Sequence, residues 1–196
     1  MNSIQKMKQA LEDLFKISAE RGENIMHNYK WREIIQKDIM IKNGIDIKDV
    51  SGITGDDFSG KDVKKGDYKS SKGYLLKNGC LSRSTGKFEF DKQNDQVKRQ
   101  ETMKYDCLFF TWFVGTSAKA SVLIKGEEAV KDFRKMATEK LSAFVKLLEE
   151  KQKEGKRVPR DSISFNYIDV VKINGARYFC EETEVTLKEF KQIFGE

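Results

Sequence analysis

An uninterrupted apolar segment, CLFFTWFV at Cys107–Val114, lies between charged residues on one side and Gly115 on the other. A strand with one face in water alternates apolar and polar residues, whereas a strand buried on both faces shows a continuous apolar run. We therefore expect this segment to be a central strand, with residues 120–124 as its antiparallel neighbour. A sheet built around such a strand needs covering layers on both sides.

Apolar residues at spacings of three and four predict four helices in the chain. They cover residues 3–21, 31–41 and 126–153, and a last helix begins near residue 186. Thr186 and Glu189 form a capping-box pattern at the start of that helix. Its side chains expected to face the core are Leu187, Phe190 and Ile193.

Further strands are expected in two pairs. Residues 45–54 pair with residues 66–71, and residues 162–171 pair with residues 176–180 through the turn sequence Asn174-Gly175. The order of elements predicts an α/β, or α+β, fold with a central mixed sheet flanked by helices. The 196 residues are expected to form a single domain. Its parts are a helical region at about 1–44, a sheet core at about 45–125, a long helix at about 126–154, and C-terminal strands and a helix at about 160–196.

Composition excludes several classes of protein. Charged residues make up 35% of the chain, but 11% aromatic residues are too many for a disordered polymer. No apolar run has membrane-spanning length and the N-terminus has no signal-peptide pattern, so we expect a soluble cytoplasmic protein without a membrane partner. A single histidine and three cysteines without a CxxC pair do not make a standard zinc site. Glycine-rich phosphate loops are missing as well, which argues against a nucleotide cofactor.

The positive charge is concentrated in one segment. Residues 60–104 hold 12 Lys and Arg against 6 Asp and Glu, and the rest of the chain holds 25 of each, so this segment carries the whole net charge of +6. A local basic excess is typical of a protein that approaches a polyanion such as nucleic acid, although a lysine-rich solubilising surface has the same composition.

Within this basic region, two acids and a lysine have the spacing D-x9-D-x-K, at Asp57, Asp67 and Lys69. Residues two apart on a strand point to the same face, so Asp67 and Lys69 project together, and Asp57 joins them if the preceding segment pairs with that strand. Converging carboxylates suit Mg²⁺, which polarises a phosphodiester and lowers the pKa of a bound water. The lysine then orients or helps to deprotonate that water and offsets phosphate charge.

The motif Gly55-Asp56-Asp57-Phe58 followed by Asp67-Tyr68-Lys69-Ser70 resembles the bipartite motif of the PD-(D/E)xK nuclease superfamily, and its short spacing is similar to that of type II restriction endonucleases. Residues 85–115 add to the likeness with an F-x-F pattern, a basic helix, an Asp and a buried strand. The resemblance departs from the family pattern in two places: Gly55-Asp56 stands in place of the proline before the first acid, and the second acid is Asp rather than Glu.

The resemblance implies a restriction-endonuclease-like fold and Mg²⁺-dependent cleavage of double-stranded DNA at a short specific sequence. Asp57 and Asp67 are then metal ligands and Lys69 is the catalytic lysine, with Mn²⁺ able to substitute and Ca²⁺ binding without cleavage. A homodimer is expected, because cutting both strands of a palindrome needs two sites related by a two-fold axis. The side chains expected to contact DNA are Lys72, Arg83, Lys87, Lys92, Gln93, Lys98 and Arg99.

Alternatives remain open at this point. Asp62 is the rival first metal ligand, although only four residues then separate the two acids. A DNA repair nuclease or junction resolvase of the same fold has the same motif. A basic DNA-binding or regulatory protein without catalysis is the third possibility, in which the acids belong to a charged loop.

Overall fold

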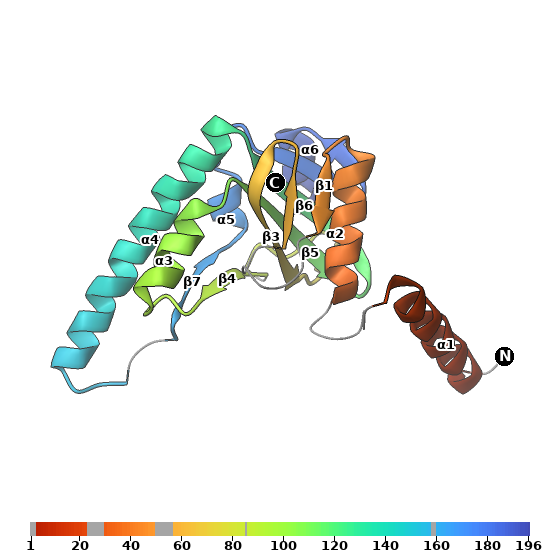
Figure 1. Ribbon diagram of the computed structural model, residues 1–196, viewed down its shortest axis with the longest axis horizontal. Coiled ribbons are helices and arrows are strands. Elements are labelled where there is room, and N and C mark those ends of the chain that lie inside the picture. Colours follow the sequence, from red (N-terminus) through yellow and green to blue (C-terminus); the bar gives the residue numbers. More distant parts are fainter. Residues whose placement is uncertain (1–2, 23–29, 50–56, 85, 158–159) are drawn as a thin grey trace.

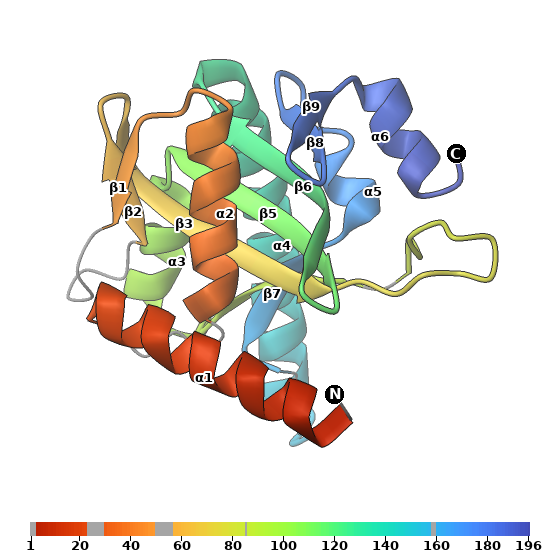
Figure 2. The same cartoon turned by 90° about the vertical axis from the view of Figure 1, so that its right-hand side faces the viewer.

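A mixed sheet around Cys107–Val114 organises the protein (Figures 1 and 2). The computed structural model describes residues 3–22, 30–49, 57–84, 86–157 and 160–196. The strands in these ranges are β1 (Ile47–Asp49), β2 (Phe58–Gly60), β3 (Val63–Lys72), β4 (Phe88–Asp91), β5 (Cys107–Val114), β6 (Ser117–Lys125), β7 (Ser162–Phe165), β8 (Arg177–Cys180) and β9 (Thr183–Val185). The helices are α1 (Ser3–Arg21), α2 (Lys30–Lys42), α3 (Gln96–Lys104), α4 (Glu127–Lys153), α5 (Tyr167–Val170) and α6 (Leu187–Ile193).

These elements form one α+β domain, as the order of predicted elements indicated. Over the described ranges the main sheet has seven strands in the order β1-β2-β3-β5-β6-β8-β9, and β4 pairs with β7 in a separate two-stranded sheet. Among the strand pairs of the described residues, only β3 and β5 run parallel, and their connection passes through β4 and α3. A parallel pair requires such a crossover, which here carries β4 and α3 to the face of the sheet that also holds α4.

The central strand is buried on both faces, which confirms the prediction from its continuous apolar sequence. Leu108, Phe110 and Trp112 belong to a core shared with β4, α4 and α6, whereas Phe109 and Phe113 belong to a second core that includes residues of α2. Figure 1 shows α2 on one side of the sheet and α3 and α4 on the other. The predicted neighbour is confirmed as β6, which pairs antiparallel along the whole length of β5.

The long helix α4 confirms the prediction for residues 126–153. Its buried side chains recur at three and four residues and include Val130, Phe133, Ala137, Leu141 and Phe144. Burial of a side chain as large as Phe133, which is fully enclosed, contributes on the order of 2–3 kcal/mol. Together these side chains hold α4 against the sheet.

The two N-terminal helices also form where their apolar spacing predicts them. Figure 1 shows α1 lying to one side of the sheet and its covering helices. Among the described residues, no helix is both long enough and apolar enough to cross a membrane.

The first predicted hairpin is wrong in its pairing. Residues 47–49 form β1, but β1 pairs with β2, and β2 in turn pairs with β3. The strand β2 has only three residues, Phe-Ser-Gly, and so carries no alternating pattern that would have revealed it. Residues 50–54 of the predicted strand lie outside the described residues.

The second predicted hairpin is wrong as well. The strand β7 ends at Phe165, because Asn166 and Asp169 form a reciprocal capping box that starts the short helix α5. The strand β8 does follow the Asn174-Gly175 turn, but it pairs with β6 and β9, while β7 pairs with β4. The capping box of α6 at Thr186 is confirmed, and Phe190 is buried in the core. Leu187 was expected to face inward but is exposed, because it occupies the first helical position beside the cap.

Candidate functional site

The β2–β3 hairpin brings Asp57 and Asp67 together. The Asp57 backbone N–H donates to Gly66 O at 2.9 Å, and the Tyr68 N–H donates to Asp57 Oδ2 at 2.8 Å. This places the Asp57 carboxylate against the β3 backbone beside Asp67, whose side chain is buried. The arrangement follows from antiparallel pairing, since Phe58 is in register with Gly66.

Glycine at position 66 is required for this close approach. A Cβ atom there would lie 2.2 Å from Cε2 of the buried Phe58 ring, so any side chain would force this ring out of its place. Displacing Phe58 would also move Asp57, the residue directly before it.

Lys69 projects to the same face as Asp67, as expected for residues two apart on a strand. Its Nζ atom lies 2.6 Å from Asp67 Oδ2 and 5.0 Å from the centre of the Phe90 ring. The three side chains Asp57, Asp67 and Lys69 therefore form one cluster, which we call the carboxylate–lysine site.

The electrostatics of this site are strongly perturbed. Burial, reinforced by the charge of Asp67 and by a hydrogen bond between the two carboxyl groups, raises the pKa of Asp57 to about 7. The Tyr68 N–H and Lys69 oppose this rise but do not cancel it. Burial alone would lower the pKa of Lys69, but the attraction of Asp67 and Asp57 outweighs it and the pKa is raised. Lys69 is therefore a cation at neutral pH, while Asp57 exchanges a proton there.

A small pocket of about 110 Å³ opens beside Lys69. The β4 strand and the residues around α3 form its other walls, including Asp91 and Glu101. Asp91 contributes to the raised pKa of Lys69, whereas Glu101 pairs with Lys98 at 2.6 Å. The pocket is thus small and lined mainly by polar and charged side chains.

The rival acid Asp62 lies elsewhere. It occupies the turn between β2 and β3, its side chain is 71% exposed, and its nearest cation is Lys125 Nζ at 4.0 Å. The turn is held by Asp106, whose carboxylate accepts hydrogen bonds from the backbone of Lys64 and Lys65. The geometry therefore groups Asp57, and not Asp62, with Asp67 and Lys69.

The predicted DNA-contacting residues do not all reach the surface. Lys72, Arg83, Lys87 and Lys92 are exposed, and Arg83 pairs with Glu196 at 2.7 Å. Lys98 is half-buried and pairs with Glu101 at 2.6 Å. Arg99 is half-buried in a groove between α3 and α4.

Gln93 lies in the interior and does not belong to the exposed basic surface. Its amide nitrogen donates to Asp91 O at 3.0 Å and to Thr102 Oγ1 at 3.3 Å. It lines the pocket beside Lys69 and supports the turn that leads into α3.

Gln36 supports the site from the opposite face of the sheet, and sequence reasoning missed it. This buried side chain of α2 donates from Nε2 to Phe109 O at 2.9 Å, to Thr111 Oγ1 at 3.1 Å and to Lys69 O at 3.2 Å. It thereby ties the backbone of Lys69 to the central strand. The only signal was its place among Ile35, Ile39 and Met40, whose spacing puts one face of the helix inward.

The oxygen donors of the site are the carboxylates of Asp57 and Asp67. Asp67 Oδ2 is buried and pairs with the ammonium group of Lys69 at 2.6 Å. Within the described ranges no three His, Cys, Asp or Glu side chains are grouped to hold a metal ion. Two carboxylates fit Mg²⁺, because this ion keeps several waters and commonly takes one or two protein carboxylates together with phosphate oxygens.

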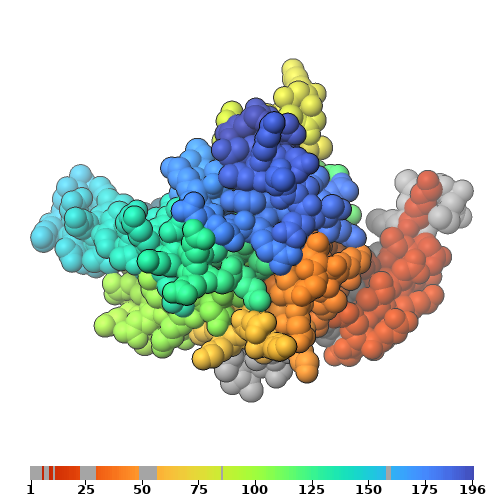
Figure 3. All heavy atoms as spheres, turned by 90° about the horizontal axis from the view of Figure 1, so that it is seen from above, coloured from red at the N-terminus to blue at the C-terminus, as the bar shows by residue number. Residues whose placement is uncertain are grey.

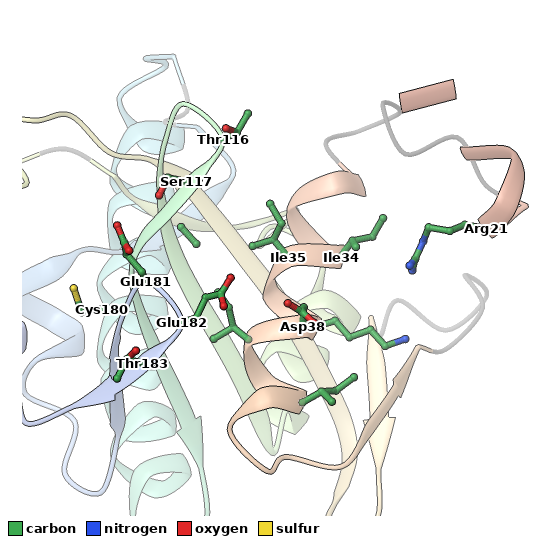
Figure 4. A pocket seen from close by; sticks show the side chains of 14 residues that line it. Arg21, Ile34, Ile35, Asp38, Thr116, Ser117, Cys180, Glu181, Glu182 and Thr183 are labelled. Carbon is green, nitrogen blue, oxygen red and sulfur yellow. The ribbon is translucent and has the colours of Figure 1, made fainter. Parts of the chain in front are cut away.

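A larger pocket of about 680 Å³ lies apart from this site, between α2 and the rim formed by β6, β8 and β9 (Figure 4). Its walls combine Ile34 and Ile35 with Asp38, Glu181 and Glu182. Lys42 bridges two of these acids, Asp38 at 2.8 Å and Glu182 at 2.7 Å, so the acidic charge is already compensated. Size alone therefore does not make this pocket the functional centre.

The chain was compared with protein-family models and with curated proteins. A scan against protein-family models gave no match to the chain, and a search of curated proteins gave none. Functional inference therefore depends on the residues of the site.

Proposed function

We propose that the protein is a type II restriction endonuclease, which uses Mg²⁺ to hydrolyse double-stranded DNA at a short specific sequence. The observation that carries the proposal is the carboxylate–lysine site, in which Asp57, Asp67 and Lys69 meet on one hairpin. Perturbed titratable groups beside a pocket are typical of catalytic sites. The mixed sheet with helices on both sides agrees with a restriction-endonuclease-like fold.

Hydrolysis adds the oxygen of a water molecule to phosphorus and breaks one ester P–O bond, which leaves a phosphomonoester and a hydroxyl. Bound Mg²⁺ would supply positive charge for the phosphate and a coordinated water of lowered pKa. Asp57 and Asp67 would hold the ion, and Asp57 would release its proton on binding, because the carboxylate is the ligand.

Lys69 acts as a fixed cation in this mechanism. Because its pKa is raised, it keeps its proton at neutral pH. It is therefore suited to donate hydrogen bonds to a phosphate oxygen and to offset the charge that develops there. Gln36 holds the backbone of Lys69 in position through the carbonyl oxygen.

In this proposal DNA binds to the basic segment, residues 60–104. The exposed side chains of Lys72, Lys87 and Lys92 flank the site along the chain and would contact phosphates. We further propose that the enzyme acts in the cytoplasm as a homodimer, because cleavage of both strands of a palindrome uses two copies of the site.

Digestion of a closed circular plasmid of mixed sequence tests the proposal. With Mg²⁺ or Mn²⁺ the full chain is expected to produce discrete fragments, and sequencing of their ends gives the recognition site. With Ca²⁺ it is expected to bind without cutting. Nicking that depends on DNA structure instead of sequence would favour a repair nuclease or junction resolvase, and no cutting with either metal would leave a non-catalytic DNA-binding protein.

A further inference from the structure

A long hairpin arm projects from the end of the strand that carries Asp67 and Lys69. It comprises residues 73–84 and leads back to β4, the strand whose Phe90 lies over Lys69. Figure 2 shows this arm extending beyond the body of the protein, and Figure 3 shows its tip as yellow atoms projecting past the blue C-terminal segment. Both ends of the arm are therefore attached to elements of the carboxylate–lysine site.

Hydrogen bonds within the arm hold it in one shape. Ser82 N donates to Tyr74 O and Leu76 N donates to Cys80 O, each at 2.8 Å. Gly79 closes the tip with its N–H on Leu76 O at 2.9 Å and has a φ of +81°, a conformation that favours glycine. Because these backbone hydrogen bonds already fix the shape of the arm, it loses little further conformational entropy when it binds a partner.

The base of the arm is braced against the C-terminal region. Leu81 is buried, and its N–H donates to Ile193 O at 2.8 Å. Arg83 pairs with Glu196 at 2.7 Å, and Gly73 N donates to Phe113 O at 2.8 Å. The arm is thus anchored against the C-terminal region as far as Cys80, whose Sγ lies 4.0 Å from Gln192 O, while residues 76–79 at its tip are exposed.

Three successive large apolar side chains are exposed along the first strand of the arm, where Leu75 lies opposite the buried Leu81 and Leu76 begins the turn at the tip. Tyr74, Leu75 and Leu76 are 48%, 50% and 49% exposed. None of the three belongs to either hydrophobic core of the described residues. A rigid projection that presents apolar side chains to solvent is the kind of element that proteins use as a wedge between base steps.

The charge around the tip selects a polyanion as the partner. From Tyr68 to Phe88 the sequence contains no acidic residue and five cations: Lys69, Lys72, Lys77, Arg83 and Lys87. Lys72 Nζ lies 4.9 Å from the centre of the Tyr74 ring, which places a cation beside the first of the three exposed side chains. In DNA, an apolar base step lies between anionic phosphates. Apolar side chains with lysines around them are complementary to this arrangement.

We propose that the arm inserts Leu75 and Leu76 between base steps of double-stranded DNA, while Lys72, Lys77 and Lys87 contact the adjacent phosphates. Five residues lie between Lys69 and Leu75. The six steps along the chain reach at most roughly 20 Å when extended, or about six base pairs of the same duplex. The insertion therefore distorts DNA near the cleavage site. This inference rests on the proposed function, because it takes the same duplex as the partner of the site.

The experiment combines binding and DNA unwinding, both with Ca²⁺ in place of Mg²⁺. Affinity of the full chain for a mixed-sequence duplex is measured by fluorescence anisotropy. Unwinding is measured as the change in linking number of a closed plasmid that is relaxed by a metal-independent topoisomerase in the presence of the protein. The test variant is Leu75→Ser with Leu76→Ser, and the matched control is Ile41→Ser with Ile168→Ser, whose side chains are 50% and 52% exposed.

Wild type and the control variant are expected to bind DNA and to change the linking number equally. The arm variant is expected to lose the change in linking number and to bind about tenfold more weakly, because two apolar side chains no longer leave water. Its thermal unfolding should match that of the control variant, since all four replaced side chains lie at the surface.

Three results would overturn the proposal. In the first, the arm variant unwinds the plasmid as wild type does. In the second, wild type binds DNA without any change in linking number. In the third, sedimentation shows wild-type dimers that the arm variant cannot form, which would make the arm a contact between copies of the chain. Cleavage with Mg²⁺ is measured separately: loss of unwinding with retained cleavage refutes the arm alone, whereas unwinding without any cleavage refutes the nuclease alone.

Discussion

Replacing Asp57 by Asn is expected to stabilise the protein in neutral solution, with a benefit that grows as pH rises. Burial and then Asp67 raise the pKa of Asp57 to about 7, against 3.8 for the free side chain. The folded state therefore keeps a proton that the unfolded chain has already released, and the free energy of unfolding falls from about pH 4 to about pH 7. An amide at position 57 imitates the protonated carboxyl, because its oxygen accepts from Tyr68 N–H and its nitrogen donates to Asp67.

The magnitude follows from the two pKa values. A tenfold change in proton affinity corresponds to about 1.4 kcal/mol, so the Asp57 carboxyl lowers the free energy of unfolding by about 2.5 kcal/mol between pH 5 and pH 8. The amide variant lacks this loss. Its stability relative to wild type should therefore rise by about 2.5 kcal/mol over the same range.

Urea unfolding at pH 5, 6, 7 and 8 in the presence of EDTA, followed by tryptophan fluorescence, measures this difference. Asp62→Asn is the matched control, because Asp62 is 71% exposed and lies in the turn away from the site. Its stability relative to wild type should stay constant with pH. A constant difference for Asp57→Asn as well, or one that falls with rising pH, would refute the burial and carboxylate coupling described for the site.

Three further outcomes follow from the same contacts. Lys69→Ala leaves Asp67 buried without its cation and is expected to lower the free energy of unfolding by about 2–3 kcal/mol at pH 8, measured by urea unfolding. Gln36→Leu leaves the Phe109 and Lys69 carbonyl oxygens without this donor and is expected to cost about 2–3 kcal/mol, whereas an unchanged midpoint would contradict its supporting role. Lys72→Ala is expected to reduce the salt dependence of DNA affinity by about one phosphate contact while leaving the cleavage products unchanged, as tested by anisotropy from low to moderate salt.

The main features of the fold were predictable where the signal is local and repeated. The helical spacing of α4 and the continuous apolar sequence of β5 each identify an element and its burial without knowledge of the rest. The pairing of the strands was not predictable in this way, because it depends on long-range contacts that the sequence of a short strand does not reveal. The three residues of β2 and the pairing of β7 with β4 are of this kind.

In the candidate site as well, local patterns predicted some residues, whereas others depend on long-range contacts. The position of Lys69 beside Asp67 follows from strand alternation alone, and a single hairpin register brings Asp57 to them. Gln36 and Gln93 were not predictable in their observed places, because burial of an amide depends on which distant backbone groups need a donor.

The raised pKa of Asp57 also explains why such a pair of acids would be kept. Two buried carboxyl groups in contact destabilise the folded protein at neutral pH, and a divalent cation is the partner that would relieve this cost. Residues that destabilise the folded protein are expected mainly at positions that serve its function.

Cleavage of one mixed-sequence DNA by single-site variants tests the proposed function most directly. Asp57→Asn, Asp67→Asn and Lys69→Ala are compared with wild type and with Asp62→Asn in Mg²⁺, while DNA binding is measured in Ca²⁺. We expect the first three to lose cleavage by at least about 10²-fold while DNA binding persists, and Asp62→Asn to cut as wild type does. Cleavage that survives in all three variants, or that is lost only in Asp62→Asn, would contradict the assignment of the site.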